Sequence, residues 1–128
     1  MNPYELIADK LSNANSLGEL TMGLEHLLNG GYNIWEDGEL YSIRQRVDKV
    51  NGLKIEIYSN EHPPPHFHVK GGGINASFSI IDCEQLEGKV GRREKALIVW
   101  WHSKGKDKLI DIWNSTRPTD CTVGVINI

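Results

Sequence analysis

The spacing of the apolar residues changes twice along this chain, and that change constrains the fold more than any other feature. Up to residue 31 they recur at helical intervals, from residue 32 to about residue 90 they alternate as in strands, and from residue 92 the helical interval returns. No long crossover separates the strands, which excludes parallel βαβ and Rossmann folds. The sequence therefore predicts an α+β fold: an antiparallel sheet with two C-terminal helices on one face and an N-terminal helical hairpin.

Capping residues and glycines predict where the N-terminal helices begin and end. Asn2 and Glu5 form one capping box, and Ser16 and Glu19 form a second. A leucine stripe at helical spacing follows the second box. Asn29-Gly30-Gly31 ends this helix, because glycine readily takes the left-handed conformation.

Glycine-containing turns divide the middle of the chain into strands. Asp37-Gly38 and Asn51-Gly52 each predict a hairpin, and Gly71-Gly72-Gly73 predicts a turn. The predicted strands are residues 32–35, 39–43, 44–50, 53–59, 66–70, 74–80 and 85–90.

The last third of the chain predicts two helices, residues 92–103 and 106–115, because Gly105 interrupts the helical pattern. Three tryptophans at helical spacing are expected in the core against the sheet: Trp100, Trp101 and Trp113. The tail, residues 122–128, is apolar and β-prone. It is interpreted either as a last strand or as a segment that docks on a partner.

The composition is that of one globular domain. The chain has 128 residues, of which 39% are hydrophobic and 24% charged. No run approaches the roughly 20 apolar residues of a membrane helix, and the first residues lack the pattern of a secretory signal. Cys83 and Cys121 have no CxxC spacing, so neither a disulfide framework nor a zinc knuckle is indicated. We therefore expect a cytoplasmic protein that does not span a membrane.

The charges are distributed unevenly. Residues 1–41 hold seven acidic side chains and one lysine, a net charge of −6, whereas residues 89–108 hold seven basic and two acidic side chains, a net charge of +5. This asymmetry indicates either an anion-binding face or an acidic partner, or else ordinary solvated faces.

Three of the five histidines lie within seven residues, in the segment from His62 through three prolines to His66-Phe67-His68. His66 and His68 are two apart on a predicted strand, so their side chains share a face about 7 Å apart, and we expect both rings to reach water. Phe67 points to the other face, toward the core. An extended proline path places His62 about 12 Å from His66, so three-histidine metal ligation from this segment alone is not favoured.

Several chemistries fit this segment. A histidine pair supplies general acid–base catalysis near neutral pH, and Arg92, Arg93 and Lys95 at a predicted helix start would hold a phosphate. A metal site would need His102 or an acidic residue as a further ligand. A protein-binding surface and a purely structural role, in which the prolines and histidines stiffen the strand entry, also remain open.

Four segments together resemble a small bacterial family, domain-of-unknown-function family 4160. They are Gly52 to Tyr58, Glu61 to Val69, Ala76 to Ile80, and Leu86-Glu87-Gly88-Lys89, followed by a C-terminal helix with Trp113 near its end. The family signature corresponds to His62, Pro64, Pro65, His66, Phe67 and His68 here. The resemblance covers about residues 43–117, which leaves residues 1–42 as an N-terminal extension and residues 118–128 as a tail.

The resemblance implies a component of a bacterial toxin–antitoxin or defence pair whose partner is a small protein encoded by a neighbouring gene. No reaction is established for the family. We expect the segment with His62, His66 and His68 to act on RNA or a nucleotide phosphate, as a ribonuclease or phosphodiesterase. The alternatives are a non-enzymatic protein-binding module (an antitoxin or adaptor) and a metal-dependent hydrolase. The cofactor is unknown, and a homo-oligomer stays open.

Overall fold

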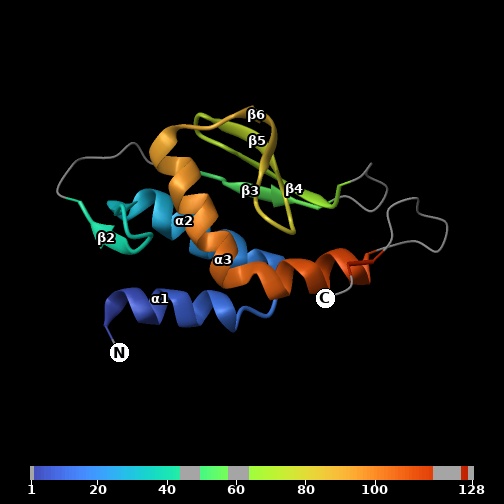
Figure 1. The fold of residues 1–128 in the computed structure, drawn as a ribbon, viewed down its shortest axis with the longest axis horizontal. Helices are drawn as coiled ribbons and strands as arrows, with labels where there is room; N and C mark the ends of the chain where they lie inside the picture. The colour runs from blue at the N-terminus through green and yellow to red at the C-terminus, as the bar shows by residue number, and fades with distance from the viewer. Residues whose placement is uncertain (1, 44–49, 58–63, 117–124, 127–128) are drawn as a thin grey trace.

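The computed structural model describes residues 2–43, 50–57, 64–116 and 125–126 (Figure 1). In chain order its elements are α1 (Pro3–Ser12), α2 (Leu17–Asn29), β1 (Tyr32–Ile34), β2 (Leu40–Ser42), β3 (Lys54–Glu56), β4 (His66–Gly71), β5 (Ile74–Ser79), β6 (Gln85–Lys89) and α3 (Arg92–Ser115). The fold is α+β with antiparallel sheets, as predicted. Among the described helices, none has both the length and the apolarity needed to cross a membrane.

Both N-terminal helices begin at the predicted caps. The Asn2 side chain accepts a hydrogen bond from the Glu5 N–H at 2.8 Å, and the Glu5 carboxylate accepts from the Asn2 N–H, which completes the capping box. Ser16 Oγ accepts from the Glu19 N–H at 3.1 Å at the start of α2, but the Glu19 carboxylate accepts from the Asn15 N–H, so the second predicted capping box is only half formed. The leucine stripe of α2 is buried, so this helix forms one side of the core.

The strands form two sheets rather than the single sheet that was predicted. β1 and β2 pair across Asp37-Gly38 as a separate hairpin, and β3-β4-β5-β6 form a four-stranded antiparallel sheet (Figure 1). The first strand of the hairpin predicted at Asn51-Gly52, residues 44–50, lies outside the described residues except for Val50, which is not in a strand. Asn29 at the end of α2 exchanges two hydrogen bonds with the backbone of Val50, at 2.7 and 2.9 Å, and so positions the entry to β3.

The backbone at position 88 requires glycine, for two reasons. Its φ is +93°, and a Cβ at this position would lie 2.0 Å from the Asn75 carbonyl oxygen and 2.6 Å from Ala76 Cα. The register between β5 and β6 shifts beside this position, between Ser77 and Phe78. Only glycine fits a backbone that approaches its neighbour so closely in this conformation.

The C-terminal region is one helix, not the two that were predicted. α3 runs for 24 residues without a break, and Gly105 lies inside it. A Cβ at Gly105 would lie 2.7 Å from the Cδ2 atom of the buried Leu20. Glycine therefore serves here for close packing of α3 against α2, not for ending a helix.

Trp101 joins the N-terminal helices to the four-stranded sheet. Its ring is fully buried and lies 5.6 Å from the Phe67 ring of β4, and its Nε1–H donates to the Leu20 carbonyl of α2 at 2.8 Å. Trp100 and Trp113 are also buried, as predicted. Of the tail, only Val125 and Ile126 are described, outside any strand. The Ile126 backbone exchanges hydrogen bonds with the Asn114 side chain of α3 at 2.8 and 3.2 Å.

Candidate functional site

The histidine pair lies on the face of the four-stranded sheet that points away from α3. Phe67 contacts Trp101 and His102 of α3, with ring centroids 5.6 and 6.2 Å apart, so α3 covers the Phe67 side of β4. Side chains alternate along a strand, which places His66 and His68 on the opposite side. Their ring centroids are 5.0 Å apart with an interplanar angle of 65°, which confirms the predicted shared face.

One hydrogen bond determines the tautomer of His66. Its Nδ1 lies 2.8 Å from the Pro64 carbonyl oxygen, which can only accept, so Nδ1 carries the proton. In the neutral ring, Nε2 therefore holds the lone pair. The Ile80 N–H donates to the Pro65 carbonyl at 2.9 Å, which holds the end of the proline run against β5. Pro64 and Pro65 thus orient the strand entry and the His66 ring together.

The expectation that both rings reach water is wrong for His66. Its side chain is only 2% exposed, whereas His68 is partly exposed with its Nε2 atom buried. The described neighbours of His66 are Ser79, which lies opposite it on β5, the His68 ring and the Pro64 carbonyl oxygen. His68 is the histidine of the pair that solvent and ligands reach more easily.

The strand register places further side chains beside His66 and His68. Glu56 on β3 and Ser77 on β5 lie opposite His68, and Ser79 lies opposite His66. The Lys70 ammonium is 3.2 Å from the Glu56 carboxylate, so a cation and an anion stand beside the pair. The alternating pattern of the sequence predicted which strand residues are polar. Only the pairing of the strands showed that these residues lie beside the histidines.

The structure does not bring the predicted phosphate-binding residues to this face. Arg92 and Lys95 are exposed on α3, which covers the other side of the sheet. His62, the third histidine of the predicted site, lies outside the described residues. The site that the structure describes therefore consists of His66, His68 and the neighbouring side chains of β3 to β5.

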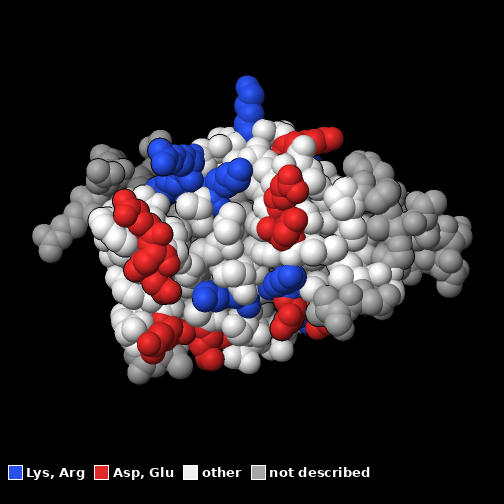
Figure 2. Space-filling model, viewed as in Figure 1, with Lys and Arg blue, Asp and Glu red and all other residues white. Residues whose placement is uncertain are grey.

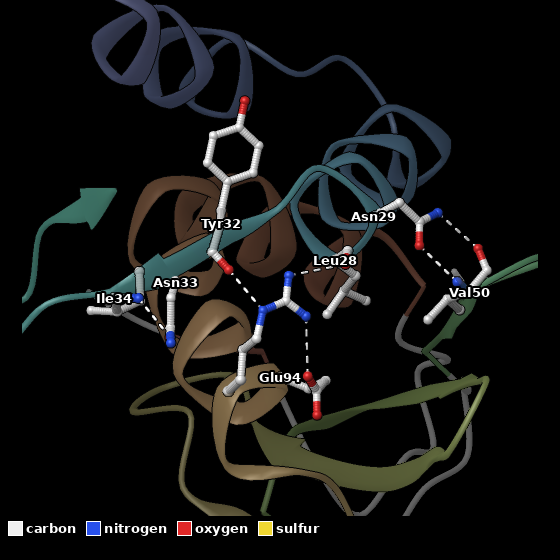
Figure 3. Close-up of polar contacts among 8 residues, drawn as sticks. Leu28, Asn29, Tyr32, Asn33, Ile34, Val50 and Glu94 are labelled. Carbon is white, nitrogen blue, oxygen red and sulfur yellow. Dashed lines mark hydrogen bonds and ion pairs between the residues drawn. The ribbon is translucent and has the colours of Figure 1, made fainter. Parts of the chain in front are cut away.

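Arg93 of α3 binds backbone carbonyls of α2 and β1, those of Leu28 and Tyr32, and both partners are labelled in Figure 3. Its Nε–H donates to the Tyr32 carbonyl at 2.7 Å and its Nη2–H to the Leu28 carbonyl at 3.1 Å, and Nη1 pairs with Glu94 at 3.2 Å. Leu28 belongs to the last turn of α2, where the carbonyls lack helical partners and the dipole favours a cation. The positive charge of Arg93 is unfavourable at the start of α3, but the carbonyl end of α2 stabilises it.

A family model described as "Domain of unknown function (DUF4160)" matches residues 52–114. Residues 52–114 are therefore similar to the DUF4160 family. The matched span contains the histidine pair, Gly88 and nearly all of α3, and it is somewhat shorter than the 43–117 inferred from the resemblance. No curated protein and no solved structure matched the chain.

Two other titratable side chains of the matched span, Cys83 and His102, are buried. Burial raises the pKa of the Cys83 thiol to about 12, so the thiol stays protonated and unreactive near neutral pH. His102 is 5% exposed, and its Nε2–H donates to the Ile80 carbonyl at 2.6 Å. Within the described residues, no group of three His, Cys, Asp or Glu side chains is arranged to hold a metal ion.

His102 is expected to make the folded chain sensitive to acid. Burial lowers the pKa of His102, while the Ile80 carbonyl and Asp82 oppose this effect and Lys106 adds to it. The unfolded chain therefore binds the proton first as the pH falls below the ordinary value of 6.5, and stability is lost from there downward. One such group contributes at most about 1.4 kcal/mol per pH unit.

Replacing His102 by glutamine, which can still donate to Ile80, should flatten this dependence. The measurement is the free energy of unfolding in urea between pH 7.5 and 5. The matched control is His26→Gln, because His26 is exposed on α2. If wild type and His102→Gln lose stability equally over this range, His102 is not the acid-sensitive group.

Proposed function

We propose that this chain acts on RNA or a nucleotide phosphate through the histidine pair, as one component of a bacterial toxin–antitoxin or defence pair. The observation that carries the proposal is the contact between His66 and His68, with the His66 ring oriented by the Pro64 carbonyl. Two adjacent imidazoles supply an acid and a base, the combination that cleavage of a phosphodiester requires. In this proposal the chain works in the cytoplasm with a small protein encoded by a neighbouring gene.

The geometry suggests different roles for the two histidines. His68 is the more exposed residue of the pair and would exchange the proton with the substrate through Nδ1, because its Nε2 is buried, while His66, buried and bonded to Pro64, would orient it. Lys70 would contact the phosphate, because it lies on the same strand and face. His62 would assist from the preceding segment. Arg92, Arg93 and Lys95 have no part in this arrangement, since α3 lies across the sheet.

The test is cleavage of a labelled single-stranded RNA by the purified chain, together with growth inhibition on expression in a bacterial host. Replacing both His66 and His68 by alanine should lower the cleavage rate by about 10²- to 10⁴-fold, the usual contribution of general acid–base catalysis. His68→Ala alone should lose nearly as much. His66→Asn, whose amide can still donate to Pro64, should retain part of the activity.

The control for these variants is His26→Ala, which removes an exposed imidazole from α2. It should leave the rate unchanged, and far-UV circular dichroism should show that each variant is folded. Undiminished cleavage and toxicity in a folded double variant would rule out the proposal.

A second candidate function is a non-enzymatic protein-binding module, an antitoxin or adaptor. The burial of His66 to 2% exposure favours it, since an orienting histidine bonded to a backbone carbonyl is also what a structural role requires. The histidine variants would then lose stability without affecting any reaction. A metal-dependent hydrolase is a third candidate, and metal analysis of the purified chain tests it.

A further inference from the structure

A groove of about 700 Å³ runs between α1 and α2, on a part of the molecule that the histidine site does not use. Its lining extends from Pro3 to Asn13, along the whole 10-residue length of α1, which is about 15 Å. At its base the two helices touch closely: a Cβ at Gly23 would lie 2.5 Å from Leu11 Cδ2. The groove is therefore a surface channel whose walls are two helices.

Both walls of the groove expose apolar side chains. Leu6 of α1 is 47% exposed and Met22 of α2 is 74% exposed, although both are large hydrophobic residues. Between them lie Ile7, partly buried, and Leu11, fully buried. A methionine at the rim of an apolar channel is typical of surfaces that accommodate a partner, because its side chain adapts its shape.

The charge around the groove indicates which partner fits it. Each wall carries one carboxylate, Asp9 on α1 and Glu19 on α2, against a single cation, Lys10. The segment that contains both walls, residues 1–41, has a net charge of −6, with three of its acidic residues at the turn between β1 and β2. Figure 2 shows acidic side chains along the lower edge of the molecule, where α1 lies in Figure 1, with basic side chains just above them. A segment with basic flanks is complementary to this field.

The two helical walls also limit which backbone conformation a partner can have. The backbone groups of α1 and α2 are hydrogen-bonded within their helices, so they cannot pair with an extended strand. β-strand addition is therefore excluded, and the geometry favours an α-helix, which satisfies its own backbone groups. About three turns of helix match the length of the channel.

We propose that this groove binds an amphipathic α-helix of a partner protein, with apolar anchors that contact Leu6 and Met22 and with lysines or arginines beside Asp9 and Glu19. This binding surface is independent of the function proposed for the histidine pair. It also gives residues 1–42 a role of their own, namely recognition of the partner.

A synthetic peptide tests the proposal with the full chain. The probe is a fluorescein-labelled 16-residue helix with leucines on one face and lysines on its flanks. Its two controls are a scrambled isomer and a version with glutamates in place of the lysines. We expect the probe to bind at least about tenfold more tightly than either control by fluorescence anisotropy, with an affinity that falls as salt is raised.

Variants locate the binding surface. Leu6→Ser with Met22→Ser should weaken the probe at least about tenfold, and Asp9→Asn should weaken it by about threefold and reduce its salt dependence. The matched control is Ile81→Ser, because Ile81 is 48% exposed but lies outside the groove, in the turn between β5 and β6.

Equal binding of the probe and its scrambled isomer, or an equal loss in Ile81→Ser, would overturn the proposal. Sedimentation velocity tests whether a second copy of this chain occupies the groove instead. If the wild-type chain dimerises and the Leu6→Ser, Met22→Ser variant does not, a second copy of this chain fills the groove and the partner helix is excluded.

Discussion

Replacing Trp101 by alanine is expected to lower the free energy of unfolding by about 4–5 kcal/mol, near the upper end of the range for removing a buried aromatic ring. The ring is fully buried between the Phe67 ring and α2, and its N–H is bonded to the Leu20 carbonyl. Truncation leaves a large cavity at the junction of helices and sheet. Because a domain of this size is stable by only about 5–15 kcal/mol, the variant should be close to unfolding at 37 °C.

Urea unfolding followed by far-UV circular dichroism measures this effect, and Trp101→Phe is its control. Phenylalanine retains most of the ring, so we expect a loss of about 1–2 kcal/mol, chiefly from the missing hydrogen bond and some lost contact. A loss below about 2 kcal/mol for Trp101→Ala, or two separate unfolding transitions, would mean that the N-terminal helices and the sheet do not share one cooperative core.

Replacing Arg93 by alanine is expected to lower the free energy of unfolding by about 3 kcal/mol. The side chain is only 18% exposed, and its guanidinium is bonded to two backbone carbonyls and to the Glu94 carboxylate (Figure 3). Its loss leaves the Leu28 and Tyr32 carbonyls without this donor and Glu94 without its cation. Arg93→Lys should recover little, because one ammonium cannot reproduce a planar fork of donors.

Arg92→Ala is the matched control for this effect. It removes the same side chain from the adjacent position, where the residue is exposed, so the change should stay within about 0.5 kcal/mol. Thermal and urea unfolding of the pair distinguish a structural arginine from a ligand-binding one. Equal, small effects of both substitutions would return Arg93 to the candidate phosphate-binding residues.

Local signals predicted the elements well where each was determined by its own residues. Asn2 and Ser16 cap the helices at the expected positions, because a cap is a contact between residues three apart. Asp37-Gly38 and Gly72 form turns, because their backbone conformations depend on glycine. Alternation also predicted that His66 and His68 share a face, which is a property of any strand.

The structural roles of Gly105 and Arg93 differ from the predicted ones for one common reason. Glycine was expected to end a helix, and an arginine at a helix start was expected to bind an anion. In each case the deciding partner is distant in sequence: Leu20 for Gly105, and Leu28 with Tyr32 for Arg93. The residues next to Gly105 and Arg93 in the sequence do not indicate which distant residues pack against them.

By itself, the sequence determined the class of the fold, the ends of the N-terminal helices, the face shared by the two histidines and the DUF4160 resemblance. These depend on periodicity and on contacts between near neighbours. Only the tertiary structure decided that α3 is continuous, that His66 is buried in a central strand, and that Glu56 and Lys70 stand beside the pair. It also decided that the basic residues of α3 lie across the sheet and that α1 and α2 form a groove. Burial and strand pairing arise from segments that are far apart in the chain, so no local pattern specifies them.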